Sequence, residues 1–589
     1  MITVKVGMAS CGIAAGANEI YETLKDHYKD SIVIKKVGCI GTCYAEPIIE
    51  VKKDDDETII FSKVTKDNVI DIIESLKENR LHHNAFAKRR DGIKKFDLPY
   101  LDELEFFKIQ HKRVSELCGI IDPENIDDYL EFGGYEALKK ALQMQRHEIL
   151  EMITQSGLRG RGGAGFPTGK KWEFVFDAEK PKYLICNFDE GDPGAFMNRV
   201  LVESNPHLLI EGILIASYVL DVDKAFIYTR AEYPLAVKRL KIALQQAKEK
   251  GIFGENGMIK VDVEIRLGAG AFVCGEETAL IASIEGKPGR PRPKPPYPAQ
   301  KGLFGRPTVI NNVETLANVP LIVKNGVDWF RAVGTSSSPG TKMFSFSGGI
   351  KNTGYIEVPL GTKLKDILSI TGVSLDQIKG VQLGGPSGGC LSKEFLDLPI
   401  DYENVPKADA IMGSGSFVII PNDTDIVEFA RYFLEFNINE SCGQCTPCRE
   451  GLMRMKEILD KILAGKGSVK DMLNLEELAL FIKEASLCGL GKAAPNPVIC
   501  TIKHFREEYV KHFKYKVIHD PTEVYYILPE KCTGCNVCTR VCPVKAITGR
   551  FFEVHTINQD LCIRCGQCQK ACGFNAIVVK SLDEIKNAK

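Results

Sequence analysis

The cysteines constrain the fold of this chain more than any other feature. Of the 20 cysteines in 589 residues, twelve fall in three tight groups, within 442–448 together with 488, within 532–542 and within 562–572. In a large chain whose N-terminus lacks a long apolar stretch, this spacing indicates metal centres in a reducing compartment rather than disulfides. We therefore expect a cytoplasmic protein of several domains.

Composition excludes two classes of partner. The formal net charge is −1, which gives no basic surface for nucleic acid. No apolar run reaches the roughly 18 residues that a membrane helix needs. We expect neither a nucleic-acid partner nor a membrane span.

The C-terminal segment contains an internal repeat. CTGCNVCTRVCP and CIRCGQCQKACG both follow C-x2-C-x2-C-x3-C, the pattern of two-cluster bacterial ferredoxins, in which the fourth cysteine of each run binds the other cluster. The second run ends in Gly573 where proline is usual, and structural zinc is the alternative. The pattern predicts one [4Fe–4S] cluster on Cys532, Cys535, Cys538 and Cys572 and another on Cys562, Cys565, Cys568 and Cys542.

A third group lies upstream in ESCGQCTPCREG. Its Cys442, Cys445 and Cys448 can hold three corners of a cluster, and Cys488 in SLCGLGK offers the fourth thiolate. This predicts a third [4Fe–4S] cluster, with a four-thiolate zinc site as the alternative.

Three further cysteines lie near the N-terminus. Cys11 is followed by Cys39 and Cys43 in GCIGTC, which resembles the thioredoxin-like [2Fe–2S] domain, whose pattern is C-x4-C followed by C-x3-C. Gly16 stands at the second position, so only three thiolates are present. Either a [2Fe–2S] cluster takes a non-cysteine fourth ligand, or the domain has lost the cluster.

Cys500 and His504 are spaced i, i+4 on a helix that begins at Asn496-Pro497. This spacing puts both on one face, suitable for two zinc ligands that His512 or His519 would complete. A surface histidine is the alternative. The other cysteines are interpreted as free and buried.

The remaining sequence divides into segments of distinct character. Residues 1–80 are typical of a small α/β unit with a hairpin at VKKDDDETIIF, and 81–120 are interpreted as a linker. A glycine-rich α/β block follows over 121–335, with strands predicted at YLICNF, KAFIYT and VDVEIRL. A small β-rich domain is predicted over 336–425, helices over 426–515 and the ferredoxin-like segment over 516–589.

RGRGGAGFPTGKKW contains a G-x-G-x-x-G pattern at Gly160, Gly162 and Gly165. A Rossmann phosphate turn requires a strand before the loop and a helix opening on its last glycine. Here the strongly helical YEALKKALQMQRHEILEMITQSGL precedes the loop, so the Rossmann context fails. Exposed backbone N–H groups beside Arg161, Lys170 and Lys171 still suit a phosphate.

Downstream, CNFDEGDPGAF, GAGAFVCGEETAL, RPKPPYPA and PTVINNVETL follow in order. With ESCGQCTPC and CGLG, these motifs make 150–510 similar to the NADH-oxidising flavoprotein subunit of respiratory complex I and its relatives in soluble hydrogenases and formate dehydrogenases. The resemblance implies an FMN site in an atypical Rossmann-like α/β domain, then a ubiquitin-like (SLBB) β-grasp domain, then a helical bundle with one [4Fe–4S] cluster. The whole chain is thus expected to be a multidomain α/β and α+β protein with a thioredoxin-like head and a ferredoxin tail.

The resemblance also implies roles for individual residues. By this resemblance the FMN-phosphate loop consists of Gly160, Arg161, Gly162 and Lys171. The flavin contacts are Asn187, Asp189, Glu190, Gly275, Glu276, Asn311 and Asn312. The NADH contacts are Phe166 and Phe174, which form the adenine walls, with Glu277 and Lys294. Three positions depart from complex I: Asp192 replaces Glu, Phe272 replaces Tyr and Tyr297 replaces Phe. A carboxylate at 192 repels a 2′-phosphate and favours NAD over NADP, an inference that the shorter Asp weakens.

These parts suit one task. NADH gives up two electrons as a hydride, an iron–sulfur cluster accepts one, and a flavin between them can do both. The added head and tail resemble the β-subunit of electron-bifurcating [FeFe]-hydrogenases, which implies a hydrogenase catalytic subunit, a small [2Fe–2S] subunit and ferredoxin as partners. One alternative is the same diaphorase module in an NAD-dependent formate dehydrogenase or transhydrogenase, and another is a complex I-type subunit. A third is a non-enzymatic protein that only conducts electrons between clusters and whose flavin site is inactive.

Overall fold

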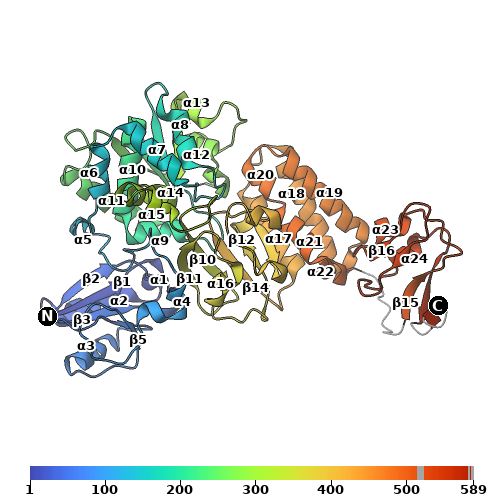
Figure 1. Cartoon of the computed structure of the whole chain (residues 1–589), viewed down its shortest axis with the longest axis horizontal. Coiled ribbons are helices and arrows are strands. Elements are labelled where there is room, and N and C mark those ends of the chain that lie inside the picture. Colours follow the sequence, from blue (N-terminus) through green and yellow to red (C-terminus); the bar gives the residue numbers. More distant parts are fainter. Residues whose placement is uncertain (269, 514–522, 582–583, 586–589) are drawn as a thin grey trace. The chain divides into compact units, whose positions relative to one another are not determined.

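The computed structural model describes residues 1–268, 270–513, 523–581 and 584–585. The chain divides into two compact units, Met1–Asn422 and Asp423–Lys589, and each is described by itself (Figure 1).

The first unit begins with a five-stranded sheet of order β2-β1-β3-β4-β5. β1 pairs with β2 in parallel and with β3 antiparallel, and the predicted hairpin is the β3–β4 pair. β5 extends this sheet past residue 80, so the segment interpreted as a linker begins inside the fold. The elements are β1 (Ile2–Gly7), α1 (Ser10–Ala14), α2 (Ala17–Tyr28), β2 (Val33–Val37), η1 (Cys43–Ala45), β3 (Ile49–Lys53), β4 (Ile59–Phe61), α3 (Val69–Lys77), β5 (Ala85–Lys88), η2 (Leu101–Glu103) and α4 (Glu105–Lys108).

A four-stranded parallel sheet of order β8-β7-β6-β9 forms the centre of the unit. Its strands are β6 (Tyr183–Phe188), β7 (Lys224–Arg230), β8 (Asp262–Gly268) and β9 (Thr308–Asn312). Three were predicted; β9, in PTVINN, was not recognised as a strand. Its helices are α5 (Ile126–Glu131), α6 (Glu136–Leu142), α7 (Arg146–Ser156), α8 (Thr168–Phe176), α9 (Met197–Ser204), α10 (Pro206–Leu220), α11 (Pro234–Glu249), η3 (Phe272–Gly275), α12 (Glu277–Ile284), α13 (Pro298–Lys301), η4 (Leu303–Gly305), α14 (Val313–Asn325) and α15 (Val327–Arg331).

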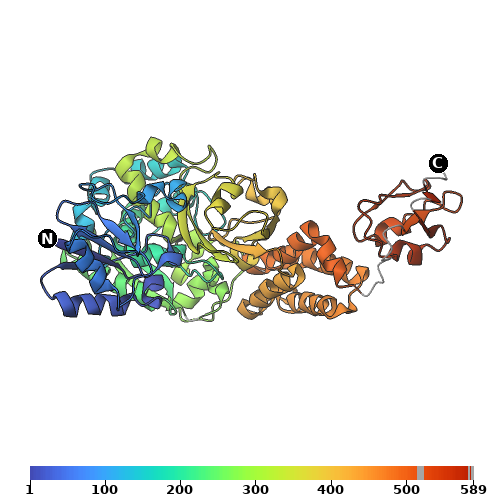
Figure 2. The same cartoon turned by 90° about the horizontal axis from the view of Figure 1, so that it is seen from below.

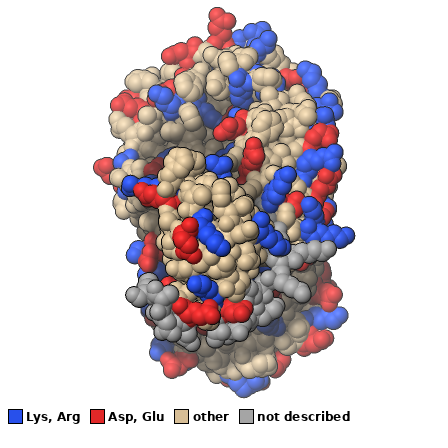
Figure 3. Space-filling model, turned by 90° about the vertical axis from the view of Figure 1, so that its right-hand side faces the viewer, with Lys and Arg blue, Asp and Glu red and all other residues tan. Residues whose placement is uncertain are grey.

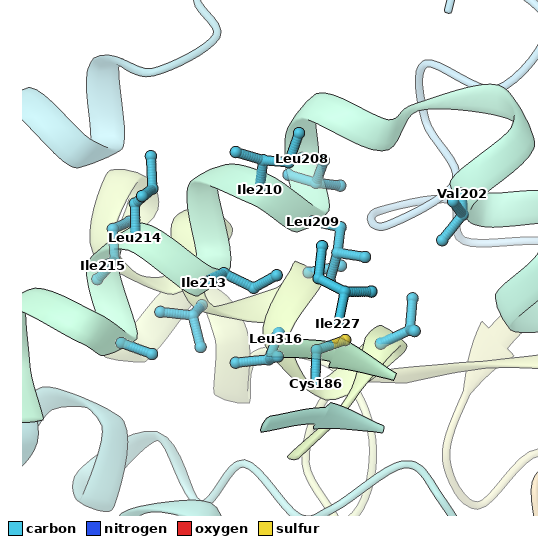
Figure 4. Packing of buried hydrophobic residues seen from close by; sticks show 14 of the residues in the cluster. Cys186, Val202, Leu208, Leu209, Ile210, Ile213, Leu214, Ile215, Ile227 and Leu316 are labelled. Atoms are coloured by element: carbon cyan, nitrogen blue, oxygen red, sulfur yellow. The ribbon is translucent and has the colours of Figure 1, made fainter. Parts of the chain in front are cut away.

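Helix α10 forms the core beside this sheet. Asn205 caps it by accepting from the Leu208 N–H at 3.2 Å, and proline occupies its first turn, where no N–H is needed. Leu209 and Ile213 lie over Cys186 of β6 and Ile227 of β7 (Figure 4). No single described helix is long and apolar enough to cross a membrane; only α9 and α10 together pass by length and composition, and they are bent by 98°.

The helix predicted before the glycine loop is two helices, α6 and α7. The break lies at Gln145, whose N–H donates to Glu148 at 2.8 Å and so starts α7 with a capping box. Gly157 then ends α7 with a φ of 68°. The prediction that a helix, not a strand, precedes the loop is confirmed, and α8 opens three residues after Gly165.

The last part of this unit is a five-stranded sheet of order β11-β10-β14-β12-β13, in which β10 and β14 are parallel. The predicted β-rich character of this segment is confirmed. Its elements are β10 (Thr341–Gly348), β11 (Gly354–Pro359), α16 (Leu364–Ser369), β12 (Ile378–Leu383), η5 (Gly385–Ser387), β13 (Gly389–Ser392), η6 (Lys393–Phe395), η7 (Val405–Ala408) and β14 (Ser416–Pro421).

The second unit begins with helices that run alongside one another (Figure 2), as predicted for this segment. They are α17 (Ile426–Glu440), α18 (Thr446–Lys461), the π-helix η8 (Ile462–Lys466), α19 (Val469–Ala485), α20 (Gly489–Ala493), α21 (Asn496–His504) and α22 (Arg506–Lys511). The cysteine repeat follows with β15 (Glu523–Ile527), α23 (Val537–Val541), β16 (Ile547–Thr548), β17 (Thr556–Ile557), α24 (Gln567–Ala571) and β18 (Ile577–Ser581). β15 pairs with β18, and β16 with β17.

Charges of both signs are interspersed on the face of the molecule drawn in Figure 3, and neither sign gathers there into a patch. This mixture matches the near-zero net charge of the sequence.

Candidate functional site

The carboxyl ends of the parallel strands meet at one edge of the central sheet. Asn187 at the end of β6 lies level with Asn312 at the end of β9. The Asn187 side chain donates to the carbonyl oxygen of Gly275 at 3.0 Å, which brings η3 to the same edge. Ligands of open α/β sheets bind outside this edge, so the predicted flavin contacts lie where the fold places a ligand.

The glycine loop crosses the end of β9. A Cβ atom at Gly162 would lie 3.1 Å from the Cβ of Asn312. Among the described residues, the backbone N–H groups of 162–165 make no hydrogen bond of good geometry. Such a run of free N–H groups is a cradle for an anion, and it fits the phosphate of FMN.

The Arg161 side chain does not face this cradle. It is 1% exposed, and its guanidinium donates to the carbonyl oxygens of Pro339 at 2.9 Å and Arg159 at 3.2 Å. Its backbone N–H donates to Thr315 Oγ1 at 2.8 Å, and Lys342 donates to its carbonyl oxygen at 3.1 Å. Arg161 therefore holds the base of the loop from inside the protein.

A chain of charges lies beside the loop. Lys171 Nζ contacts Glu277 Oε1 at 2.5 Å and the Ile310 carbonyl oxygen at 2.9 Å. Lys294 lies 2.9 Å from Glu276 and 3.4 Å from Glu277. Although burial opposes it, the two lysines lower the pKa of Glu277. The cations are thus positioned and partly neutralised by carboxylates.

Two exposed aromatic rings flank the loop. Phe166 is 46% exposed and Phe174 is 56% exposed, and their ring centroids are 6.5 Å apart. Exposed rings at this separation fit the predicted adenine walls. Tyr297 is also exposed, and Phe272 packs near Gly191, where an added Cβ would lie 3.1 Å from the ring.

Several predicted flavin contacts are engaged with the protein itself. Glu190 accepts from the N–H groups of Asn198 and Arg199, both at 2.9 Å, so it caps α9. Burial raises its pKa to about 7. Asn311 accepts from the Trp172 indole at 2.9 Å, and Asp189 pairs with Arg230 at 3.5 Å.

The carboxylates at 192, 276 and the amide at 312 are also fixed by local bonds. Ser414 donates to Asp192, and burial raises the pKa of Asp192 to about 6. Glu276 accepts from Thr278 N at 2.8 Å and caps α12, and Asn312 accepts from Glu314 N at 2.9 Å and caps α14. These side chains position the helices that surround the cradle.

The structure adds residues that sequence reasoning missed. The Tyr402 hydroxyl donates to the Gly160 carbonyl oxygen at 3.0 Å, and a Cβ at Gly165 would lie 2.4 Å from the Tyr402 ring. Glu403 pairs with Arg159. No local signal could have found them, because they lie more than 200 positions from the loop and belong to the β-rich segment.

The cysteines of the helical bundle lie close together. Burial raises the pKa of the Cys448 thiol to about 11, and the neighbouring thiols of Cys445, Cys488 and Cys442 add to the rise. Ser441 Oγ lies 3.2 Å from Cys448 Sγ.

The ferredoxin-like segment forms two pockets, and each contains one cysteine from the other repeat. One pocket is lined by Cys562, Cys565, Cys568 and Cys542. The other is lined by Cys532, Cys535, Cys538 and Cys572. In both, a backbone N–H donates to the sulfur of the crossing cysteine, from Ala546 at 3.2 Å and from Ala576 at 3.3 Å. The structure thus brings together the two predicted sets of four.

The separation of these sulfurs can be compared with that expected for a zinc site. Four thiolates on one zinc lie about 3.8 Å apart, since each Zn–S bond is about 2.3 Å. Among the described residues, no three of the twelve cysteines in these groups lie within 4.8 Å of one another. These sulfurs are therefore further apart than ligands of a single zinc ion would be.

The sulfur atoms of the N-terminal cysteines lie closer together than those of the three cysteine groups described above. The sulfurs of Cys11, Cys39 and Cys43 all lie within 4.8 Å of one another, and Cys39 and Cys43 are 3.9 Å apart.

The structure does not complete the predicted zinc site within the described residues. Cys500 and His504 share α21, but among the described residues no third ligand joins them in a group within 4.8 Å. His512 instead contacts Asp425 at 2.7 Å, and His519 lies outside the described residues.

Comparisons with known proteins match this architecture. The chain matches the Nuo51 FMN-binding domain over 153–321, the NADH-ubiquinone oxidoreductase-F iron-sulfur binding region over 428–512, and the 4Fe-4S binding domain over 525–548 and 555–578. It is 48% identical over 459 residues to the NADP-reducing hydrogenase subunit HndC of Solidesulfovibrio fructosivorans, covering 76% of this chain and 94% of that protein. It is 44% identical over 394 residues to an NADH-quinone oxidoreductase subunit of Aquifex aeolicus, covering 66% and 92%.

A solved structure of an NAD+-reducing [NiFe]-hydrogenase in the air-oxidized state aligns with a TM-score of 0.61 and 32% identity, covering 87% of this chain and 85% of that one. The fold and site define a flavin and iron–sulfur module. The chain belongs to the family of NADH-oxidising FMN and iron–sulfur subunits that includes the Aquifex aeolicus NADH-quinone oxidoreductase protein and the hydrogenase protein HndC. It is an oxidoreductase module of the NADH dehydrogenase type.

Proposed function

We propose that this chain is the NAD(H)-reacting subunit of an electron-bifurcating hydrogenase. The observation that carries the proposal is the anion cradle at the edge of the parallel sheet, flanked by two exposed aromatic rings, in a chain that also has three four-cysteine groups. Bound FMN would exchange a hydride with the nicotinamide ring and single electrons with the clusters.

The chain's own residues bind and orient the reactants in this proposal. The free N–H groups of 162–165 hold the flavin phosphate, while Asn187 and Asn312 line the edge where its ring system lies. Phe166 and Phe174 hold the adenine of NADH between their rings. Lys171 and Lys294 attract phosphates, and the carboxylates of Glu276 and Glu277 set their positions. Orientation of this kind is the main contribution that a protein makes to hydride transfer.

The proposal includes domain and ligand assignments. The five-stranded sheet at the N-terminus is the thioredoxin-like head, and the order β11-β10-β14-β12-β13 with α16 supports a ubiquitin-like domain. The clusters are held by the three sets of four cysteines, with Cys542 and Cys572 crossing. Cys442, Cys445, Cys448 and Cys488 hold the cluster of the helical bundle.

Partners and cofactor preference also belong to this proposal. A cytoplasmic complex with a hydrogenase catalytic subunit, a small [2Fe–2S] subunit and ferredoxin is supported by the hydrogenase relatives and by the ferredoxin-like segment. The family resemblance places the Asp192 carboxylate beside the adenosine ribose, where it would repel a 2′-phosphate and favour NAD over NADP. One relative is named an NADP-reducing hydrogenase subunit, so a comparison of NADH with NADPH as electron donor tests this preference directly.

The test of the module uses the full chain purified without oxygen. NADH should reduce a viologen dye, and NADPH should do so much less well. Replacing either Phe166 or Phe174 by Ser should raise the KM for NADH about tenfold, since stacking on one base contributes about 1–3 kcal/mol, while FMN content stays unchanged. Phe132→Ser is the matched control, because Phe132 is 49% exposed and lies outside the site. If the FMN-loaded protein does not reduce the dye with NADH, the remaining interpretation is a protein that only conducts electrons between clusters.

The identity of the catalytic partner requires the native complex. Hydrogen-dependent reduction of NAD+ that requires oxidised ferredoxin supports the bifurcating hydrogenase. Reduction of NAD+ that depends on formate, with no reduction by hydrogen, would instead identify the catalytic partner as a formate dehydrogenase.

A further inference from the structure

The three cysteines of the head form a tighter group than any other in the described chain. Their sulfurs all lie within 4.8 Å of one another, and the Cys39–Cys43 separation is 3.9 Å. In a tetrahedral site with Zn–S bonds of about 2.3 Å, sulfurs lie about 3.8 Å apart. The group therefore has nearly the dimensions of three ligands on one ion.

A [2Fe–2S] cluster does not fit these residues. Such a cluster takes four ligands, two on each of two irons, and ligands on different irons are separated by the width of the cluster. Three sulfurs this close leave no room for that separation. Gly16, at the fourth position of the pattern, has a φ of 110°, a conformation that an L-residue such as cysteine rarely adopts.

We propose that Cys11, Cys39 and Cys43 bind a single Zn²⁺ ion, with the carboxylate of Glu46 as the fourth ligand. Thiolates favour Zn²⁺, Cu(I) and iron–sulfur clusters, and among these a tetrahedral site completed by a carboxylate oxygen suits Zn²⁺. Glu46 is 4% exposed, and its Oε1 lies 3.7 Å from Cys11 Sγ. Its other oxygen, Oε2, accepts from the Ile48 N–H at 2.9 Å. Oε1 lies outside the group of three sulfurs that are all within 4.8 Å of one another, so it would have to move toward Cys39 and Cys43 to complete the site.

The surroundings give the ion a structural role. The Cys39 N–H donates to Ser204 Oγ at 3.3 Å, and the Tyr355 hydroxyl donates to the Cys39 carbonyl oxygen at 2.7 Å. Ser204 ends α9 beside the central sheet, and Tyr355 lies in β11. One ion would therefore fix the loop at which three parts of the first unit meet.

The test measures metals in the full chain, purified without oxygen and passed through a chelating column. We expect about one zinc per chain beside the iron of the [4Fe–4S] clusters. The double replacement Cys11→Ser and Cys39→Ser should remove the zinc, leave iron and FMN unchanged and lower the thermal midpoint by roughly 5 °C or more. Cys118→Ser is the matched control, because Cys118 is buried nearby but lies outside the group.

X-ray absorption at the zinc edge on the unmodified chain keeps the proposal testable if the double variant does not fold. We expect three sulfurs at about 2.3 Å and one oxygen at about 2.0 Å, and loss of an ordered carboxylate ligand in Glu46→Ala. Zinc with four sulfurs, about two additional irons with sulfide that depend on Cys39, or a Cys39–Cys43 disulfide without metal would each overturn it.

Discussion

The ferredoxin-like pockets and the glycine-loop site differ in how far apart their parts lie along the chain. All eight cysteines of the two pockets lie within 532–572, and each pocket is lined by cysteines from two short motifs. The glycine loop is held by Thr315, Pro339, Lys342 and Tyr402. The pockets are therefore encoded by local sequence, whereas the glycine-loop site depends on tertiary structure. We expect a single mutation in a pocket to remove a whole cluster, and single mutations around the glycine loop to weaken flavin binding by degrees.

The largest effect is expected for Cys542→Ala. This change should abolish the cluster of Cys562, Cys565 and Cys568, with a loss of about four irons per chain, because Cys542 lines their pocket. Iron analysis and EPR provide the measurement. The EPR difference should match that of Cys562→Ala; a match to Cys532→Ala would show that the repeats do not cross.

Arg161→Ala is expected to have the next largest effect. It removes a buried cation that bonds two carbonyl oxygens, at a cost of roughly 3 kcal/mol, and the loop should lose FMN as a result. Thermal unfolding and flavin content measure this, with iron content expected to stay intact. Lys241→Ala is the control, since that lysine is exposed on α11 and has no part in the loop. Loss of FMN at unchanged stability would place Arg161 at the phosphate instead.

Glu190→Gln tests the electrostatics of the same site. Burial raises the pKa of Glu190 from 4.5 to about 7. The folded state therefore keeps a proton that the unfolded state releases in this window, so stability falls as pH rises from about 4.5 to 7, by at most about 1.4 kcal/mol per pH unit. The variant should lose this part of the slope in thermal midpoints measured from pH 5 to 8, whereas the exposed Glu136→Gln should keep it. An unchanged slope in Glu190→Gln would contradict the assignment.

The smallest effect is expected for Tyr402→Phe, which removes one hydrogen bond to the glycine loop. Its loss should cost about 1 kcal/mol, or roughly a fivefold weaker FMN affinity, measured by fluorescence titration of the flavin-free chain. Tyr432→Phe, on an exposed side chain of α17, should leave the affinity unchanged. An equal loss of FMN affinity in both variants would show that the hydrogen bond from Tyr402 to the loop does not support flavin binding.

The same difference explains what could be predicted from sequence. The helices of 426–515, three of the four central strands and both sets of crossing cysteines follow from local periodicity and spacing. The residues around the glycine loop and the roles expected for them came from family resemblance rather than from local patterns. Arg161 was interpreted as a cation of the phosphate loop, and only the position of Pro339 shows that its side chain is buried. Tyr402 and Ser414 carry no local pattern, because their contacts join the β-rich segment to Gly160 and Asp192, which lie more than 200 positions away.

The contacts of Tyr402 and Lys342 with the loop also bear on where this protein can be divided. The FMN-binding family match ends at 321, and a fragment cut there would retain every loop glycine yet lack both side chains that hold the carbonyls of Gly160 and Arg161. Modules of this protein exchanged between complexes should therefore be joined after 422, and detachment of the β-rich segment would release flavin.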